Sequence, residues 1–340
     1  MASDKLPPPE PSLTFHGSEG TVSCMRYKSE GLLAGRLFSG STHTFVYVWD
    51  LVSTKKLSTK FRCDELAEKN DTVLSIIPSA RTSDEVSIQV RNGSLHKWRL
   101  AESTPVRLQV SSPGQQLGFC PALDLPEAAL IALPSGGVAR NASALGLVDA
   151  ETFEPAALLC PEECIGPPMR AARYKDRQLF VAHESGDVLL WDIRSPSLPV
   201  FVSSAFRTSS PRSVHCDEDF GALTPLALDV DTDRDLLIVG GTSNLLRRFK
   251  ITPTGLDPLD STSLSTSGVS DVKIRPDNKI VTVSSWDFTA RIYSWKALKP
   301  LAVLDMHKDT VQCIEYAMVR ERNCVVLGGK DGLISVWPLY

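Results

Sequence analysis

The chain has 340 residues, of which 42% are hydrophobic and 7% aromatic, and its formal net charge is -4. This composition is typical of a folded globular protein with a large core, and it contains no Lys or Arg block that would favour direct nucleic-acid binding. The first residues have no apolar core of a signal peptide, and the longest apolar stretches are too short to cross a bilayer. We therefore expect a soluble intracellular protein without membrane contact.

Residues 1–11 are rich in proline and are expected to form a disordered tail, followed by one domain over residues 12–340. Within that domain, the chain repeats one pattern of short strands. An apolar segment is followed by a strand of small residues, a tight turn and a strand that ends on an aromatic or apolar residue. The residues at this last position are Trp49, Trp98, Val148, Trp191, Phe249, Tyr293 and Trp337.

Successive members of this series are 49, 50, 43, 58, 44 and 44 residues apart, close to the length of a WD40 repeat. The spacing predicts an all-β fold, a seven-bladed WD40-type β-propeller. Because the last blade ends with the chain, its outer strand is missing. The segment from Ser12 to His16 is expected to supply this strand and to close the ring.

The last blade carries the His…Asp…Trp hydrogen-bonded arrangement of WD repeats at His307, Asp331 and Trp337. Gly329 stands where that network usually has Ser or Thr, so we expect the network to be incomplete. These residues are expected to be structural, with a buried charge-assisted bond that stabilises the turn. We expect the same structural role for further repeat-register residues, namely Trp49, Trp191, Asp287, His43 in the Asp position of blade one, and His16 as its loop histidine.

Residues 195–222 account for the longest interval and predict an extended loop. Such loops often carry function, and a solvated insertion is the alternative.

No phosphate-binding loop, zinc-protease motif or nucleophile elbow is present, so no catalytic residue, cofactor or metal is expected. Cys160 and Cys164 lack the second pair of ligands that a zinc site needs. The acidic run from Asp229 to Asp235 lacks the Gly and Glu of an EF-hand loop and is expected to be a hairpin turn.

The segment 272–312 contains the phrases Ile274-Arg275-Pro276-Asp277 and Pro300-Leu301-Ala302-Val303-Leu304. With the ending from Lys330 to Tyr340, it resembles the WD-repeat ASTRA-associated protein 1 family of fungi. It is also similar to the animal counterpart, the guanine nucleotide-binding protein subunit beta-like protein. The resemblance is strong over roughly the last 75 residues and generic over the middle of the chain.

The resemblance implies a non-catalytic scaffold of the ASTRA assembly, which is linked to chromatin remodelling. It also implies work with the TTT co-chaperone group in the maturation and stability of phosphatidylinositol-3-kinase-related kinases, in nucleus and cytoplasm. These proteins are the expected partners of a single propeller within a larger complex. No G-protein γ subunit is expected, because residues 1–20 are too rich in Pro and Gly for a coiled-coil helix.

A second hypothesis comes from Trp191-Asp192-Ile193-Arg194, which resembles the docking box of substrate receptors of cullin-4 ubiquitin ligases. Asp192 and Arg194 would then be the exposed contacts. The alternative is that a Trp-Asp pair followed by a basic residue is simply common at this strand end.

The repeat register places Trp286, Arg291 and Lys330 on or near one rim face of the propeller. An exposed Trp beside basic residues has the composition of an interface hot spot. The alternative for Trp286 is packing against the neighbouring blade.

Overall fold

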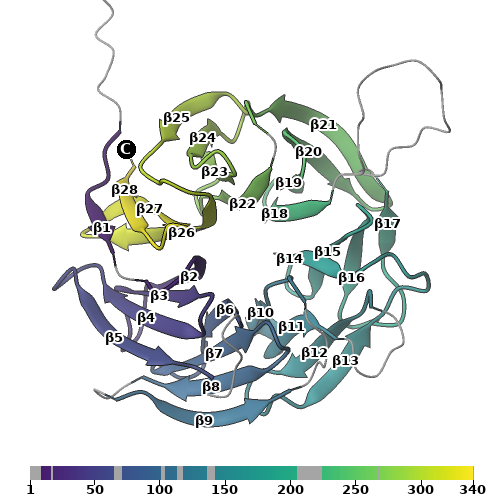
Figure 1. Ribbon diagram of the computed structural model, residues 1–340. Coiled ribbons are helices and arrows are strands. Elements are labelled where there is room, and N and C mark those ends of the chain that lie inside the picture. Colours follow the sequence, from purple (N-terminus) through teal and green to yellow (C-terminus); the bar gives the residue numbers. More distant parts are fainter. Residues whose placement is uncertain are drawn as a thin grey trace, which may run out of the picture.

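The computed structural model describes residues 9–16, 18–64, 71–100, 104–112, 118–135, 142–204, 224–266 and 268–339. These residues form seven four-stranded antiparallel sheets that surround a common hub (Figure 1), so the predicted seven-bladed propeller is confirmed. Within these ranges, no helix is long and apolar enough to span a membrane.

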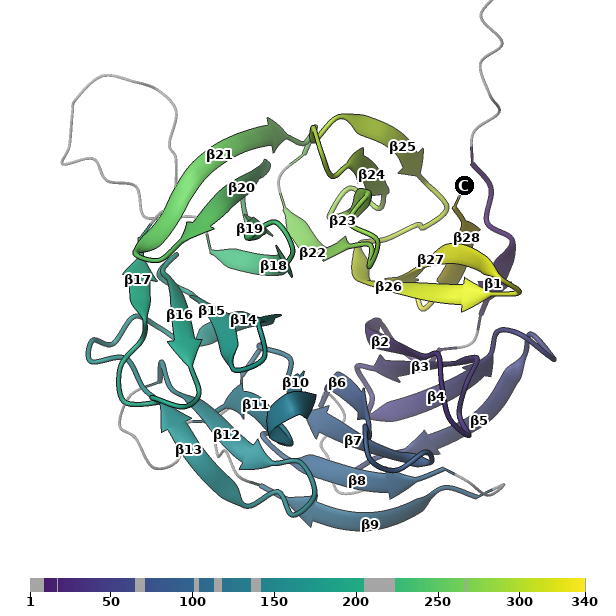
Figure 2. The same cartoon turned by 180° about the vertical axis from the view of Figure 1, so that it is seen from behind.

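Each blade runs from an innermost strand at the hub to a fourth strand at the circumference (Figures 1 and 2). The innermost strands are β2 (Val22–Lys28), β6 (Val73–Pro78), β10 (Leu123–Leu125), β14 (Pro168–Tyr174), β18 (Pro225–Asp231), β22 (Val269–Ile274) and β26 (Val311–Val319). The second strands are β3 (Arg36–Ser41), β7 (Glu85–Val90), β11 (Leu130–Pro134), β15 (Gln178–His183), β19 (Leu236–Gly241), β23 (Ile280–Ser285) and β27 (Arg322–Gly329). A single 3-10 turn, η1 (Pro126–Ala128), lies between β10 and β11 in the described chain.

The third and fourth strands complete the blades. The third strands are β4 (Phe45–Asp50), β8 (Leu95–Arg99), β12 (Leu145–Asp149), β16 (Val188–Asp192), β20 (Leu245–Thr252), β24 (Ala290–Ser294) and β28 (Ile334–Pro338). The fourth strands are β5 (Leu57–Arg62), β9 (Val106–Ser111), β13 (Pro155–Leu159), β17 (Phe201–Ser203), β21 (Gly255–Ser263), β25 (Pro300–Leu304) and, from the other end of the chain, β1 (Leu13–Phe15). All seven residues of the repeat series lie in third strands.

The extended loop predicted over residues 195–222 is partly wrong. Phe201–Ser203 forms β17, the fourth strand of blade four, because it pairs with Val188–Leu190 of β16. Residues 205–223 and residues 1–8 of the predicted tail lie outside the described residues.

The two rim faces differ in the connections they carry. On the face that we call the upper face lie the turns between second and third strands and the loops that join one blade to the next. The turns between first and second strands, and between third and fourth strands, lie on the opposite, lower face. This division follows from the up-and-down strand order in every blade.

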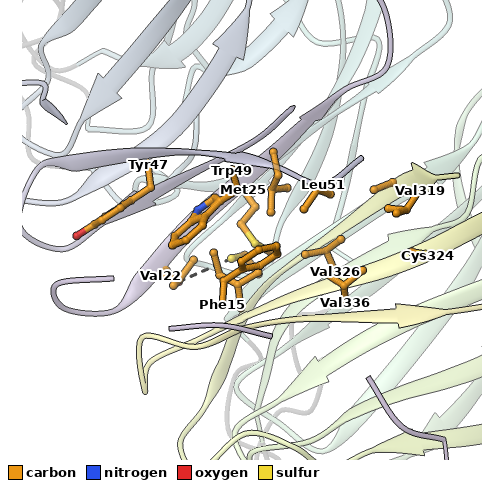
Figure 3. Close-up of a cluster of buried hydrophobic side chains, with 14 residues drawn as sticks. Phe15, Val22, Met25, Tyr47, Trp49, Leu51, Val319, Cys324, Val326 and Val336 are labelled. Carbon is orange, nitrogen blue, oxygen red and sulfur yellow. Dashed lines mark hydrogen bonds between the residues drawn. The ribbon is translucent and has the colours of Figure 1, made fainter. Parts of the chain in front are cut away.

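The ring is closed by β1, which pairs antiparallel with β28 so that Leu13 faces Val336 and Phe15 faces Ile334. Phe15 is only 6% exposed, and its ring centroid lies 5.0 Å from that of Trp49 in blade one. Figure 3 shows this side chain between the two blades. Strand β1 therefore completes blade seven, as predicted from the sequence, and it also packs against blade one.

Adjacent blades approach closely near the hub at glycines of the second strands. A Cβ atom added at Gly40 would collide with Val73 of the next blade, and one at Gly240 would collide with Val269. Gly328 occupies the matching place in blade seven, against Val22 of blade one. Small residues are needed in these strands because the first valine of the following blade fills the space.

Carboxylates tie successive blades together at the hub. Asp229 of blade five accepts the backbone N–H of Ile274 in blade six at 2.7 Å. Asp271 of blade six likewise accepts the N–H of Ile314 in blade seven at 3.0 Å. Burial raises the pKa of Asp229 to about 6, although its two backbone N–H donors oppose that shift.

Replacing Phe15 with Ala tests the closure. Loss of this buried ring should lower the free energy of unfolding by about 3–5 kcal/mol, because it leaves a cavity between the two blades. Urea denaturation of the full chain would measure the change. The exposed neighbour Thr14, changed to Ala, is the matched control and should shift stability by less than about 0.5 kcal/mol. Equal effects of the two substitutions would show that Phe15 does not hold the ring.

Asp229→Asn tests the hub carboxylate. Between about pH 4 and pH 6, folded Asp229 keeps a proton that the unfolded chain has released, so its contribution to stability falls as pH rises through this window. Asn keeps an oxygen for the Ile274 N–H and does not titrate. The variant should therefore gain about 1–3 kcal/mol relative to the native chain between pH 4 and pH 7.

Urea denaturation at pH 4, 5, 6 and 7 would measure that difference. Asp257→Asn, a substitution at an exposed position of β21, is the control and should leave the stability equal to that of the native chain at each pH. A stability difference between Asp229→Asn and the native chain that stays constant with pH would contradict the assignment.

Candidate partner-binding surface

The upper face of blade seven contains a continuous hydrogen-bonded chain of side chains. Trp337 Nε1 donates to Ser335 Oγ at 2.8 Å, and Ser335 Oγ lies 2.9 Å from His307 Nε2. His307 Nδ1 in turn lies 3.1 Å from Asp331 Oδ1. A neutral imidazole satisfies all three contacts if Nδ1 carries the proton and Nε2 accepts the Ser335 hydroxyl. The lowered pKa of His307, caused by burial against the opposing effect of Asp331, agrees with that tautomer.

The prediction that this network is incomplete is wrong. Ser335 of the third strand supplies the hydroxyl that the second strand lacks at Gly329. A Cβ atom at Gly329 would run into both the Asp331 carboxylate and the His307 ring. Glycine at this position is therefore what allows the His–Asp contact to form.

Blade one does not repeat the arrangement. His16 and His43 are both exposed, and no hydrogen bond of either ring occurs among the described residues, so the expected buried bond is absent there. Trp49 is satisfied differently, since its Nε1 donates to Ser39 Oγ of the second strand at 2.9 Å. The prediction of a structural role is confirmed for Trp49, but His16 and His43 do not take part in a side-chain network of blade one.

The turn of blade six is fixed by Asp287. Its carboxylate accepts Thr289 Oγ1 at 2.7 Å and both terminal nitrogens of Arg291, at 3.2 and 2.5 Å. Burial opposes ionisation, but the bonds from Arg291 and Thr289 hold the pKa of Asp287 well below its usual range. Arg291 also donates to Ser265 Oγ at 2.9 Å, and its side chain is only 15% exposed. Arg291 therefore braces the turn and presents little surface to a partner.

Trp286 lies on this braced turn and packs within its own blade. The backbone N–H of Trp286 donates to the carbonyl of Gly268 at 3.1 Å, and the Ser285 hydroxyl donates to the same oxygen. A Cβ atom at Gly268 would overlap the indole, so the ring lies directly against this glycine. The side of Trp286 away from Gly268 remains open, and the residue is 42% exposed.

Two further exposed apolar side chains on the upper side of blade six were not found from the sequence. Phe288 is 45% exposed and has φ of +70°, a left-handed backbone conformation that is costly for a bulky residue. Met306 is 40% exposed and follows Leu304, the strand partner of Ala290 at the end of the same turn. The only indication of this surface in the sequence was Phe288 itself, because a turn at that position would more often have Gly or Asn, which avoid backbone strain.

The structure places the sequence-predicted contact residues on opposite faces. Trp286 lies on the upper face of blade six. The exposed Lys330 lies one blade further, in the turn of blade seven, where its backbone N–H donates to the carbonyl of Thr310.

We call Trp286, Phe288 and Met306 the aromatic rim.

Asp192 and Arg194 follow the third strand of blade four and therefore lie on the lower face. Arg194 Nε donates to Asp192 Oδ1 at 2.9 Å, and its terminal nitrogen lies 2.5 Å from Oδ2. Arg194 thereby lowers the pKa of Asp192 to about 2. The side chain of Arg194 is 67% exposed, whereas that of Asp192 is 14% exposed. The expectation of two exposed contacts is wrong for Asp192, because its partner in the structure is Arg194.

The acidic run forms the expected hairpin turn between β18 and β19, and its carboxylates serve the fold. Asp231 accepts Trp295 Nε1 at 2.6 Å, and Asp235 accepts the Tyr174 hydroxyl at 2.6 Å. Across the described ranges, no three His, Cys, Asp or Glu side chains gather as metal ligands.

The fold and the turn networks define the class. A protein-family model described as WD domain, G-beta repeat, matches residues 9–50 and 258–294. The chain therefore contains WD repeats and has the architecture of a seven-bladed propeller.

Within that class, the chain is similar over its whole length to guanine nucleotide-binding protein subunit beta-like protein 1 of Mus musculus. The two are 26% identical over 353 aligned residues, which cover 100% of this chain and 99% of the relative. ASTRA-associated protein 1 of Schizosaccharomyces japonicus is 22% identical over 98% of this chain and 99% of its own length. The protein of that name from Schizosaccharomyces pombe is 41% identical over 73 residues, 22% of this chain and 19% of its own. The family resemblance inferred from the sequence is confirmed.

Gly329→Ser tests the network of blade seven. The substitution restores the residue type expected from WD repeats, yet its Cβ would displace His307 or Asp331. We expect a loss of about 1–3 kcal/mol in the free energy of unfolding, as in other overpacked sites. Gly255→Ala is the matched control, since a Cβ there meets open space. A Gly329→Ser protein as stable as the native chain would contradict this role of the glycine.

Proposed function

We propose that this protein is a non-catalytic WD-repeat scaffold of the ASTRA assembly. In this proposal it acts in nucleus and cytoplasm with the TTT co-chaperone group, in the maturation and stability of phosphatidylinositol-3-kinase-related kinases. Similarity along nearly the whole chain to proteins named ASTRA-associated protein 1 supports the assembly. The propeller fold supports a role in protein–protein contact, because it presents rigid rim faces.

The observation that carries the proposal is the aromatic rim on the upper face of blade six. Trp286 and Phe288 are both more than two-fifths exposed, although burial would be favourable for such large apolar side chains. Exposed aromatic residues on an ordered surface are the residue types that dominate interface energies.

The rim is also preorganised. Asp287 and Arg291 fix the turn from beneath, and Gly268 supports the indole from behind. A partner that covers these rings would therefore order few side chains on binding, which preserves more of the gain from apolar burial. The left-handed backbone at Phe288 fits a position maintained for contact, since strained conformations cluster at functional sites.

Trp286→Ala tests the surface. We expect the variant to remain folded and to capture TTT proteins or a related kinase at least tenfold less well, because a hot-spot Trp contributes about 2 kcal/mol or more. Quantitative mass spectrometry of the tagged full chain, purified gently from its own cells, would measure capture. Circular dichroism and urea denaturation would confirm the fold.

Leu32→Ser is the matched control, because Leu32 is a 65% exposed apolar residue in the turn between β2 and β3 on the lower face. Unchanged capture by folded Trp286→Ala would remove the aromatic rim from the proposal. Enrichment of a cullin-4 adaptor in place of the TTT proteins, lost in Arg194→Ala, would replace the scaffold proposal with the ubiquitin-ligase one.

A further inference from the structure

A cavity of about 730 Å³ lies between the innermost strands at the hub of the propeller. Its volume lies within the range of small-molecule sites, roughly 300–1,000 Å³. Six cationic side chains belong to residues that line it: Arg26, Lys28, Arg170, Arg173, Lys175 and Lys273. We call the part of the cavity nearer the upper face its upper half and the rest its lower half. The two halves differ in how the cationic side chains are paired.

In the upper half, the charges are used by the fold. Arg170 of blade four reaches past blade five and forms an ion pair with Asp271 of blade six. Asp271 also accepts the N–H groups of Val272 and Ile314, both at 3.0 Å. With its charge and its lone pairs satisfied in this way, Asp271 leaves little at this level for a ligand to bind.

Two cations of the lower half are also paired. Lys273 lies 2.8 Å from Glu315, and Lys175 lies 3.3 Å from Asp235. Both of these pairs join neighbouring blades, so they contribute to the wall of the channel.

Three cations of the lower half are paired weakly or not at all with a carboxylate at close range. Arg173 is exposed, and its side chain has neither an ion pair nor a hydrogen bond within the described part of the chain. Lys28 donates only to the carbonyl of Ser79, at 2.9 Å, and Arg26 is 3.9 Å from Glu315. They come from blades one and four, so they converge on the channel from different sides.

Asp124 of blade three lies among these cations. Burial raises the pKa of its carboxyl group, and Arg173, Arg26 and Lys28 oppose that rise without abolishing it. Glu127, Asp176 and Asp229 also line the cavity, so five cationic and four acidic residues surround its lower half. Cations exceed acidic residues there by one, and burial, which raises the pKa of Asp229 to about 6, weakens the negative charge of that residue further.

We propose that the lower half of the channel binds a compact small-molecule polyphosphate, such as a phosphorylated inositol or a short inorganic polyphosphate. The guanidinium groups of Arg26 and Arg173 have the fork geometry that suits phosphate oxygens, and Lys28 adds a point charge. A hub cavity of this volume with clustered charges fits a compact ligand better than an extended acidic peptide, which would need a groove. This inference is independent of the aromatic rim.

Isothermal titration calorimetry on the full chain would test the site, with sodium tripolyphosphate and inositol hexakisphosphate as separate probes. At least one probe should bind with one-to-one stoichiometry and weaken as salt is raised from 50 to 200 mM, as expected for charge recognition. Binding of one probe alone would identify which of the two phosphate chemistries fits the channel.

Substitutions give the sharper test. Arg173→Ala should weaken binding at least tenfold, and Asp124→Asn should strengthen it several-fold by removing a negative charge while keeping a polar group. Arg177→Ala is the matched control, because Arg177 is exposed in the turn that follows β14 but does not line the cavity. Circular dichroism would show that each variant is folded.

Three results would overturn the proposal. The first is no one-to-one binding of either probe, and the second is an equal loss of affinity in Arg173→Ala and Arg177→Ala, which would indicate general surface attraction. The third is binding of a hexaglutamate peptide, with the same dependence on Arg173, when neither polyphosphate binds. That result would reassign the channel to an acidic protein segment.

Discussion

The pairing of β1 with β28 is the interaction on which the rest of the propeller depends. Without it, blade seven would have three strands and an open edge, and the apolar surface around Trp49 would lose the Phe15 ring that covers it (Figure 3). A ring of repeats also needs this closure thermodynamically. In an open array the terminal repeats lack one neighbour, whereas in a closed ring every blade is packed on both sides.

The close packing of the blades at the hub has consequences for polar groups. Gly40, Gly240 and Gly328 let the next blade approach so closely that little room remains for water between the strands. Backbone N–H groups at that depth need acceptors from the protein, and Asp229 and Asp271 provide them across blade boundaries. These two hub carboxylates are therefore committed to structure.

The fold was predictable because its signals are periodic. A strand-ending aromatic or apolar residue at each repeat gave the number of blades, including blade three, where Val148 takes the aromatic position. The details of the site were less predictable because they depend on local geometry. A hydroxyl can reach the Trp indole from the second strand, as Ser39 does, or from the third, as Ser335 does.

Other features were outside the reach of sequence analysis for distinct physical reasons. Asp192 reads as an exposed acid until the neighbouring Arg194 is seen to fold back onto it. The channel cations come from blades that meet only at the hub, so no short motif unites Arg26 with Arg173. Phe288 shows its significance only through its backbone conformation, which the residue type alone does not specify.

The two faces are suited to independent use. The aromatic rim lies at the upper edge of blade six, whereas Arg26, Lys28 and Arg173 lie in the lower half of the channel, below the Arg170–Asp271 ion pair of the upper half. A ligand in the lower half would contact neither the Trp286 turn nor the Asp287–Arg291 brace. Coupling between the sites would require two arrangements of the blades, and the closed ring disfavours such a change because every blade is held by both neighbours. A small ligand in the hub would thus act mainly by stabilising the folded ring, and a protein on the rim would bind the same rigid surface with the channel filled or empty.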